Sequence, residues 1–194
     1  MSQAPAPPKP KRATALPAEE RRSAIVAAAL PLLLEHGDRM TSRQIAEAAG
    51  IADGTIFRVF ADKDELIVAV LEAALDPAPF ETAVAELAPD LDFEAALTAA
   101  AVISQQRVID VYRMLAGVGA KYTDSARRPL ADSESLTQLF ARYRDRISVE
   151  PVAAARLFRA FSLSTTHPML AVDPKSPEEL VHLFLHGVAK DATC

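Results

Sequence analysis

Apolar residues recur along most of this chain at the spacing of helices, and no stretch alternates as a half-buried strand would. The first helical stretch begins at Pro17, a favourable first-turn residue, and ends at Gly37, a residue type that commonly stops helices. Its inward positions are spaced by three or four residues: Ile25, Ala28, Ala29, Leu32 and His36. Pro31 lies inside this helix and removes one backbone donor, so we expect a bend there.

Two much shorter helical stretches follow. Thr41 and Gln44 have the spacing of a capping box, and Gly50 ends a helix of about two turns. The inward positions of this second helix are predicted to be Ile45, Ala48 and Ala49. A third helix is expected to start near Asp53 and to end near Phe60.

The third helix is too short to be stable alone, so packing must hold it. Ile56 and Phe60 are four residues apart and can face the core together with Ile51. The residues left outside are Thr55, Arg58 and Val59, with Phe57 at the edge. A short helix anchored along one side, after a tight turn, is the geometry with which a helix-turn-helix enters the major groove. An ordinary small helical subdomain would show the same pattern.

The remaining two-thirds of the chain is also predicted to be helical. Asp62 and Glu65 have the spacing of a second capping box, which opens a helix to about Leu75. Prolines punctuate residues 76–91, where we expect a hinge and at most one short helix. The later predicted helices span 92–104, 105–121, 132–148, 150–166 and 176–190. The fold class is therefore all-α with about nine helices.

We divide the chain into three parts. Residues 1–16 hold four prolines and three basic residues without an acid, which predicts a disordered, mildly cationic tail. Residues 17–61 form the helix-turn-helix domain, and residues 62–194 form a helical bundle in which residues 62–75 are the connector.

Composition excludes several classes of protein. Half of the 194 residues are hydrophobic, but the longest apolar run, residues 24–34, is shorter than the roughly 18 residues of a membrane span. The N-terminus does not resemble a signal peptide. Cys194 is the only cysteine, so an intramolecular disulfide or a cysteine-rich metal site is impossible. We expect a cytoplasmic protein.

The net charge of −5 is unevenly distributed. Residues 1–63 carry nine Lys/Arg and seven Asp/Glu, a net of +2, whereas residues 64–194 carry twelve and nineteen, a net of −7. Because salt screens charges over about 8–10 Å, a basic end can approach phosphates while the body stays acidic.

The stretch "TSRQIAEAAGIADGTIFRVFADKDELIVAVL" resembles the DNA-binding signature of the TetR/AcrR transcriptional regulators. The resemblance extends from the first helix to the start of the fourth. Near the other end, "PEELVHLFLHGVA" is similar to the closing dimerisation helix of that family. The resemblance implies a DNA-binding homodimer with a palindromic operator and a small-molecule effector. By resemblance to the family, we expect a repressor rather than an activator.

The resemblance also implies roles for individual residues. The implied DNA-binding residues are Thr41, Ser42, Arg43, Asp53, Gly54, Thr55, Phe57, Arg58, Val59 and Lys63. Arg43 and Arg58 are candidates for guanine or phosphate contacts, and Lys63 for a phosphate contact.

Three positions depart from the family pattern. Phe57 stands where a tyrosine is usual, so a hydroxyl for phosphate is missing. Ala52 replaces a common serine, so we expect Asp53 to cap the third helix, with a contact to cytosine as an alternative. Val59 offers only apolar contact, for example to a thymine methyl group.

The C-terminal part would dimerise and bind the effector. The predicted dimer residues are Leu157, Val181, Phe184, Leu185 and Val188, on two helical stripes that could instead be internal core. The candidate effector-binding residues are Arg107, Tyr112, Arg113, Met114, Tyr143, Phe158, Phe161 and Met169, each of which could also be core or surface.

His182 and His186 have a spacing that can place two imidazoles on one metal ion. The sequence offers no third ligand nearby, so we expect the pair to flank the dimer stripe and expect neither a metal nor a cofactor. Catalysis is not expected, because no nucleophile elbow, P-loop, dinucleotide fingerprint or zinc-protease motif occurs. The alternative to a DNA-binding regulator is a helical protein-interaction module that has lost DNA binding.

Overall fold

The computed structural model describes residues 17–123 and 131–187 of the chain. Within these ranges all regular structure is helical and no strand occurs, which confirms the all-α prediction. The predicted tail of residues 1–16, Val188 and most of the loop predicted around residues 123–129 lie outside the described residues.

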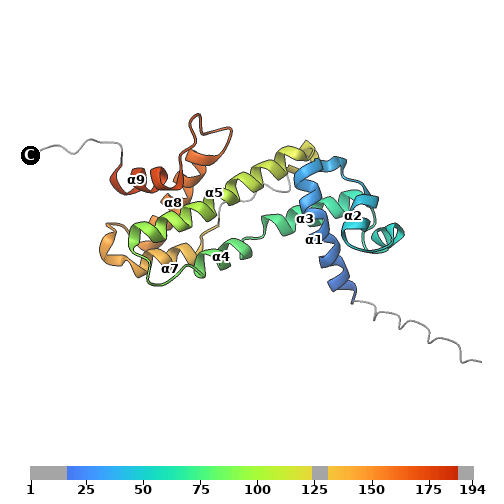
Figure 1. Ribbon diagram of the computed structural model, residues 1–194, viewed down its shortest axis with the longest axis horizontal. Helices are drawn as coiled ribbons and strands as arrows, with labels where there is room; N and C mark the ends of the chain where they lie inside the picture. The colour runs from blue at the N-terminus through green and yellow to red at the C-terminus, as the bar shows by residue number, and fades with distance from the viewer. Residues whose placement is uncertain (1–16, 124–130, 188–194) are drawn as a thin grey trace, which may run out of the picture.

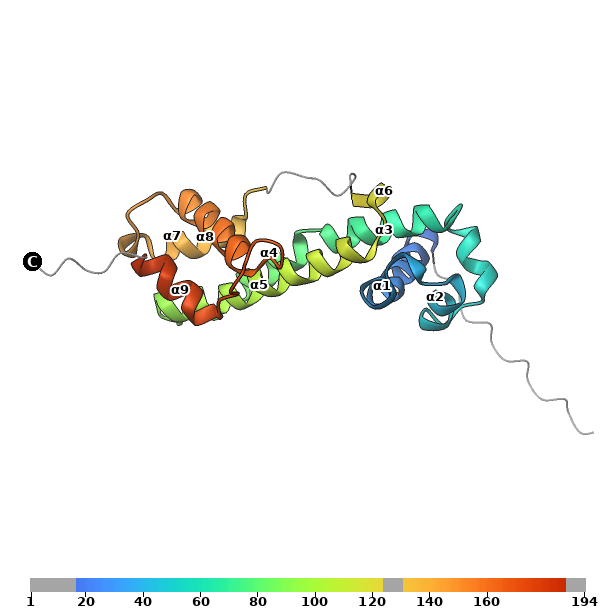
Figure 2. The same cartoon turned by 90° about the horizontal axis from the view of Figure 1, so that it is seen from above.

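The molecule is elongated, with one helical unit at each end (Figures 1 and 2). The N-terminal unit consists of α1 (Ala18–His36), η1 (Gly37–Arg39), α2 (Ser42–Ala48), η2 (Asp53–Arg58) and α3 (Lys63–Leu75). The remaining elements are α4 (Ala78–Ala85), α5 (Phe93–Gly117), α6 (Ala120–Thr123), α7 (Glu134–Arg142), η3 (Arg144–Arg146), α8 (Pro151–Thr166) and α9 (Pro177–His186).

Two hydrophobic clusters lie at the two ends of α5. The N-terminal cluster includes Ile25, Leu33, Ile45, Ile56, Phe60 and Leu66 from the first helices, and it receives Met114 and Val118 from the end of α5. The C-terminal cluster includes Leu97, Leu136, Phe140, Phe158, Leu180 and Val181. A helix of 25 residues is about 37 Å long, so α5 joins the two cores as one rigid element.

A single α5 replaces the two helices predicted for residues 92–104 and 105–121. The predicted break fell at two polar residues, Ser104 and Gln105. Both are buried and hydrogen-bonded: the Ser104 hydroxyl donates to the Ala100 carbonyl oxygen, and Gln105 Nε2 donates to the Lys175 carbonyl oxygen. Because their polar groups find partners inside the protein, the helix continues through them.

Other boundaries are close to the predictions. Thr41 and Gln44 form the predicted capping box, and α1, α3 and α8 begin and end within a few residues of the expected positions. The second capping box is only half formed, because Glu65 accepts from the Ala61 amide rather than from Asp62. The third helix is a 3-10 helix, η2, and the predicted helix at residues 132–148 divides into α7 and η3.

Gly37 fixes the approach of α1 to α5. Its φ of 62° and ψ of −147° fall in a region that is open almost only to glycine. A Cβ atom at this position would lie 2.0 Å from the carbonyl oxygen of Gly117, so the two backbones cross without room for a side chain. The N-terminal unit is thereby seated against the end of α5.

Candidate nucleic-acid interface

The N-terminal end of α2 is fixed by its cap. Gln44 Oε1 accepts from the Thr41 amide at 2.8 Å, and Thr41 Oγ1 accepts from the Gln44 amide at 3.3 Å. Met40 precedes the cap and Ile45 lies in the next turn, and both are fully buried. This is the spacing of a hydrophobic staple, which sets the angle at which the chain enters the helix. Arg43 is therefore presented to solvent on a rigid first turn.

η2 follows after a turn at Gly50, whose φ of 65° is positive. Ile56 and Phe60 are 1% exposed, so the predicted anchors hold this element in the core. Arg58 is exposed, and Phe57 keeps 53% of its surface in solvent. Packing rather than intrinsic helix stability positions these side chains, since six residues cannot form a stable helix alone.

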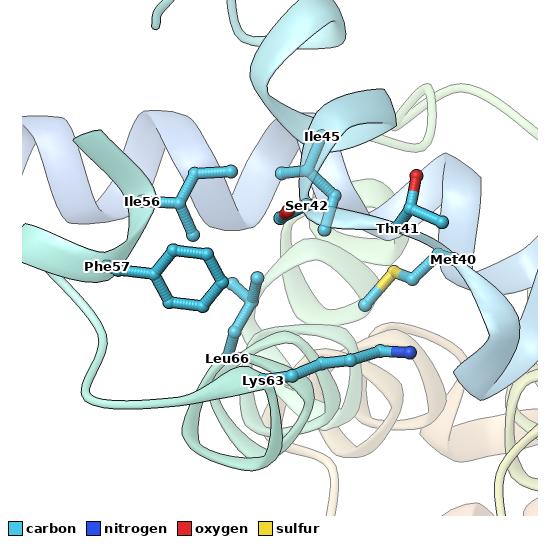
Figure 3. A pocket seen from close by; sticks show the side chains of 8 residues that line it. All are labelled: Met40, Thr41, Ser42, Ile45, Ile56, Phe57, Lys63 and Leu66. Carbon is cyan, nitrogen blue, oxygen red and sulfur yellow. The ribbon is translucent and has the colours of Figure 1, made fainter. Parts of the chain in front are cut away.

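A hollow opens between α2, η2 and the start of α3 (Figure 3). It is lined by Met40, Thr41, Ser42, Ile45, Ile56, Phe57, Lys63 and Leu66. Figure 3 shows the Phe57 ring and the Lys63 side chain extending into it from η2 and α3. The Lys63 ammonium donates to the Asp38 carbonyl oxygen, and an ammonium group has two further protons for an anion.

Four of the predicted DNA-binding residues line this hollow: Thr41, Ser42, Phe57 and Lys63. Seven of the predicted DNA-binding residues are exposed: Thr41, Arg43, Asp53, Gly54, Phe57, Arg58 and Lys63. Ser42, Thr55 and Val59 are half-buried. Neither Arg43 nor Arg58 has a hydrogen bond or ion pair to the part of the chain that the structure describes, so both guanidinium groups are available.

Three local predictions were wrong. Val59 packs against the N-terminal cluster instead of pointing outward. Ala48 is exposed, and Ala46 takes the predicted inward place. Asp53 lies in the first turn of η2 and makes no capping hydrogen bond, because the N-cap position is Ala52. The error at Val59 follows from η2 being a 3-10 helix rather than an α-helix. The error at Ala48 is one of face, because α2 is a regular α-helix that buries Ile45 and Ala46.

The start of α3 is held by contacts on two sides. Arg22 of α1 lies over the Phe60 ring at 4.3 Å and pairs with Glu65 at 3.0 Å. The Ala61 amide, followed by Arg22, lowers the pKa of the Glu65 carboxyl group. These contacts fix the helix turn that carries Lys63.

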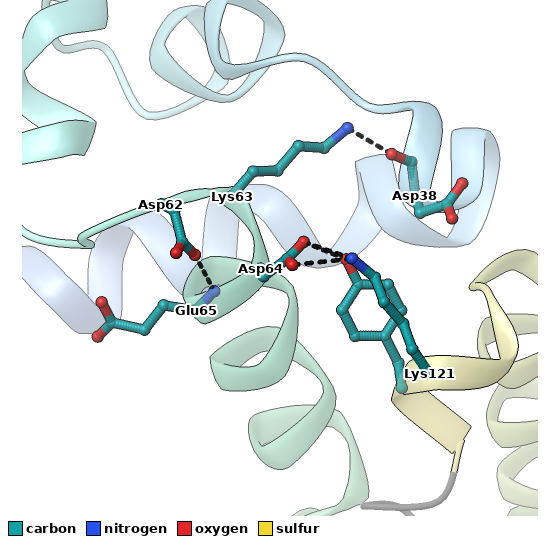
Figure 4. A network of polar contacts seen from close by, with 7 residues as sticks. Asp38, Asp62, Lys63, Asp64, Glu65 and Lys121 are labelled. Carbon is teal, nitrogen blue, oxygen red and sulfur yellow. Dashed lines mark hydrogen bonds and ion pairs between the residues drawn. The ribbon is translucent and has the colours of Figure 1, made fainter.

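On its other side, Asp64 of α3 meets α6 (Figure 4). Asp64 accepts from Lys121 Nζ at 2.8 and 2.9 Å and from the Tyr122 hydroxyl at 2.5 Å. The Lys121 hydrogen bonds are the main reason that the pKa of Asp64 is lowered. The turn of α3 that carries Lys63 is therefore linked directly to α6.

Sequence reasoning missed the floor of the hollow, Met40 and Leu66, and the Asp38 carbonyl group that holds Lys63. Met40 could have been found, because an apolar residue before a capping box and another at the fourth helical position form a recognisable signal. The Asp38 contact could not, since it depends on how α3 packs against η1.

The structure does not gather the candidate effector-binding residues into one pocket. Met114 lies in the N-terminal cluster, whereas Phe158 and Phe161 contact the Phe184 ring in the C-terminal one. Met169 is 78% exposed on the connection between α8 and α9.

The polar candidates among them have separate roles. Arg107 donates to the Ala74 and Asp76 carbonyl oxygens at the end of α3, at 2.5 and 3.0 Å. Burial lowers the pKa of its guanidinium group. Tyr112 stacks edge-on against His167, Tyr143 donates to the Leu91 carbonyl oxygen, and Arg113 is exposed.

The candidate dimer residues divide between core and surface. Val181 is fully buried in its own chain, and Phe184 and Leu185 are half-buried against the C-terminal cluster. Leu157 on α8 is 56% exposed and is thus the described member of this set that is most available to a partner.

Comparison with known proteins identifies the N-terminal unit. The family model of "Bacterial regulatory proteins, tetR family" matches residues 25–70, which cover the greater part of α1, the helix-turn-helix and more than half of α3. Residues 25–70 of this chain form a TetR-family DNA-binding domain. The protein is a DNA-binding transcriptional regulator, and regulators of this kind are transcription factors rather than enzymes.

Solved structures support the TetR fold beyond the matched domain. A TetR/AcrR-family transcriptional regulator from Thermobifida fusca is 19% identical, with a TM-score of 0.56 over 88% of this chain and 100% of that one. A protein described as a TetR-family regulator from Rhodococcus is 20% identical, with a TM-score of 0.54 over 86% and 95%. At this identity the likeness shows the fold alone. No helix in the described ranges is long and apolar enough to cross a membrane.

Proposed function

We propose that this TetR-family regulator is a repressor that binds a palindromic operator as a homodimer and leaves it when a small molecule binds. The supporting observation is that Phe57 and Lys63 line one hollow, that Arg43 and Arg58 are exposed on the α2 and η2 elements bordering it, and that Ile56 and Phe60 anchor η2 in the core. The guanidinium groups suit guanine edges and phosphates, and the ammonium group suits a phosphate. We place the DNA-binding domain at residues 17–61 and assign the protein to the cytoplasm, where its DNA target would be.

Dimerisation follows from the size of the DNA-binding element. η2 has six residues and can reach only a few base pairs, so specific binding needs a second copy one helical turn of DNA away. The C-terminal helices α8 and α9 lie in the helical unit at the opposite end of the molecule from the hollow (Figure 2). We assign them to the dimer contact, with Leu157 as the exposed apolar residue at its centre.

Release by an effector would act through α3. This helix carries Lys63 at its start, is linked to α6 through Asp64, and is held at its end by Arg107 of α5. A ligand that shifts α5 within the C-terminal bundle would therefore displace both ends of α3. The ligand can weaken DNA binding only by as much as its own affinity differs between the DNA-binding arrangement of the protein and the displaced one.

Selection of bound sequences from random duplex DNA tests the proposal. We expect an enriched palindrome with half-sites one helical turn apart, bound with an affinity that falls steeply with salt. A small-molecule library is then screened for release of that operator. A protein that shifts no duplex at low salt would instead be the interaction module that has lost DNA binding.

A further inference from the structure

The outward face of α9 carries two histidines side by side. His182 and His186 are one helical turn apart, both are exposed, and their ring centroids are 4.8 Å apart. Neither ring has a hydrogen bond or ion pair to the rest of the described chain. Val181 faces inward, so the histidines do not belong to the core that the same helix helps to form.

The separation of the two rings matches that of metal ligands. Two imidazoles on one zinc ion, with Zn–N bonds of about 2.0–2.1 Å and a tetrahedral angle, hold their ring centroids about 5 Å apart. The pair needs no change of helix geometry to reach this arrangement, because α9 is a regular helix with a complete capping box at Ser176 and Glu179. The histidines are thus preorganised as a two-nitrogen ligand.

The local field also favours a cation. His186 is the last residue of α9 and His182 lies one turn before it, so both face the negative end of the helix dipole. Glu178 lies one turn before His182 on the exposed side and adds a negative charge.

The described part of one chain does not complete the site alone. Among the described residues, no group of three or more His, Cys, Asp or Glu side chains is placed to hold a metal ion. Zinc in a closed site takes four ligands. In a dimer whose two-fold axis passes beside α9, the second copy contributes the same two imidazoles.

We infer that His182 and His186 bind a divalent transition metal ion together with the same pair from a second copy, giving a four-imidazole site between two α9 helices. The four-ligand form of this metal site rests on the homodimer that is part of the proposed function. Imidazole nitrogen selects zinc, copper and nickel over magnesium and calcium, which prefer oxygen. The ion stabilises the association of the two chains.

Calorimetric titration of metal-free Cys194→Ser protein with zinc chloride tests the site, since this substitution removes the only thiol. We expect one zinc ion per two chains, and at least tenfold weaker binding after His182→Gln or His186→Gln. His36→Gln is the matched control and should leave zinc binding unchanged. Magnesium chloride should not bind at this site.

Sedimentation in EDTA and in zinc separates this inference from the proposed dimer. Three outcomes overturn the metal site but leave the dimer standing, provided that the protein is a dimer in EDTA. These are no zinc binding, one zinc ion per chain, and zinc binding that is equally tight when either histidine is replaced. A monomer under both conditions overturns the dimer and the four-imidazole site with it. A dimer that is tighter in zinc, with the tightening abolished by His186→Gln, supports both.

Discussion

Phe57 lies at the rim of the hollow, with its ring beside Lys63 and the start of α2 (Figure 3). Replacing it with tyrosine adds a hydroxyl group to a ring that is already 53% exposed. A phenolic donor near a phosphate adds about 1 kcal/mol or somewhat more, because hydrogen bonds to charged groups exceed neutral ones. We expect Phe57→Tyr to bind the selected operator several-fold more tightly, as measured by fluorescence anisotropy. Phe57→Leu is the control, and equal affinity of the tyrosine variant and the unaltered protein would contradict the assigned orientation.

Lys63 and Arg58 are expected to contribute to DNA binding in different ways. Lys63→Ala should weaken binding to all duplexes alike and reduce the slope of log affinity against log salt by about one, since it removes one phosphate contact.

Arg58→Ala should change which bases are preferred at one position of each half-site, at a cost of about 1–3 kcal/mol. Repeating the selection with each variant measures both effects. Arg144→Ala, in η3, is the control.

Individual residues were predictable where local spacing determines them. Thr41, Gln44, Ile56 and Phe60 have the roles that their intervals indicate, because caps and anchors depend on neighbours within one helical turn. Val59 was not predictable, since its orientation depends on η2 being a 3-10 helix rather than an α-helix.

At the scale of elements, the crossing of η1 and α5 depends on Gly37. Gly37→Ala would place a methyl group 2.0 Å from the Gly117 carbonyl oxygen and would also force an unfavourable φ. We expect a loss of more than about 3 kcal/mol in the free energy of unfolding, because a backbone clash adds to the conformational cost. Gly50→Ala is the matched control: its φ is also positive, but nothing lies within 4 Å, so we expect a loss of about 1–2 kcal/mol. Urea denaturation measures both, and equal losses would exclude the clash.

Long-range packing explains why some elements were predicted and others were not. α1 and α8 have uninterrupted helical spacing and clear ends, and both appear close to their predicted bounds. The buried Gln105 amide in the middle of α5 has its partner in the Lys175 carbonyl oxygen, 70 positions away in the chain. No local pattern contains that partner.

The whole molecule should lose stability in acid through carboxylates whose pKa values are lowered. For Glu81, burial raises the pKa, but the Ser135 amide at 2.8 Å, the Ser133 and Ser135 hydroxyls and Arg159 together bring it below the usual 4.5. A carboxylate whose pKa is lower in the folded state than in the unfolded state contributes stability above its unfolded pKa. That contribution is lost as the pH falls through the folded pKa. We expect the urea midpoint to change little through this group from pH 7 to 5 and to fall below about pH 4.5. Glu81→Gln should flatten part of that fall, and an unchanged acid limb would count against the role of Glu81.

Coupling between the two ends of the molecule is expected to pass through the contact of Asp64 with α6 (Figure 4). Neither Lys121 nor Asp64 belongs to the predicted DNA-binding set, yet their pairing holds the turn that carries Lys63. Lys121→Met should therefore weaken operator binding without altering base preference, because Asp64 loses two of its three hydrogen bonds to α6 while the predicted DNA-binding side chains are unchanged. Lys175→Met is the matched control, since Lys175 also forms an exposed ion pair, with Asp173, but on the connection before α9. Anisotropy titrations of both variants measure the effect. If Lys121→Met binds the operator as well as Lys175→Met does, the contact with α6 does not position α3, and any influence of the C-terminal helices on DNA binding must take another path.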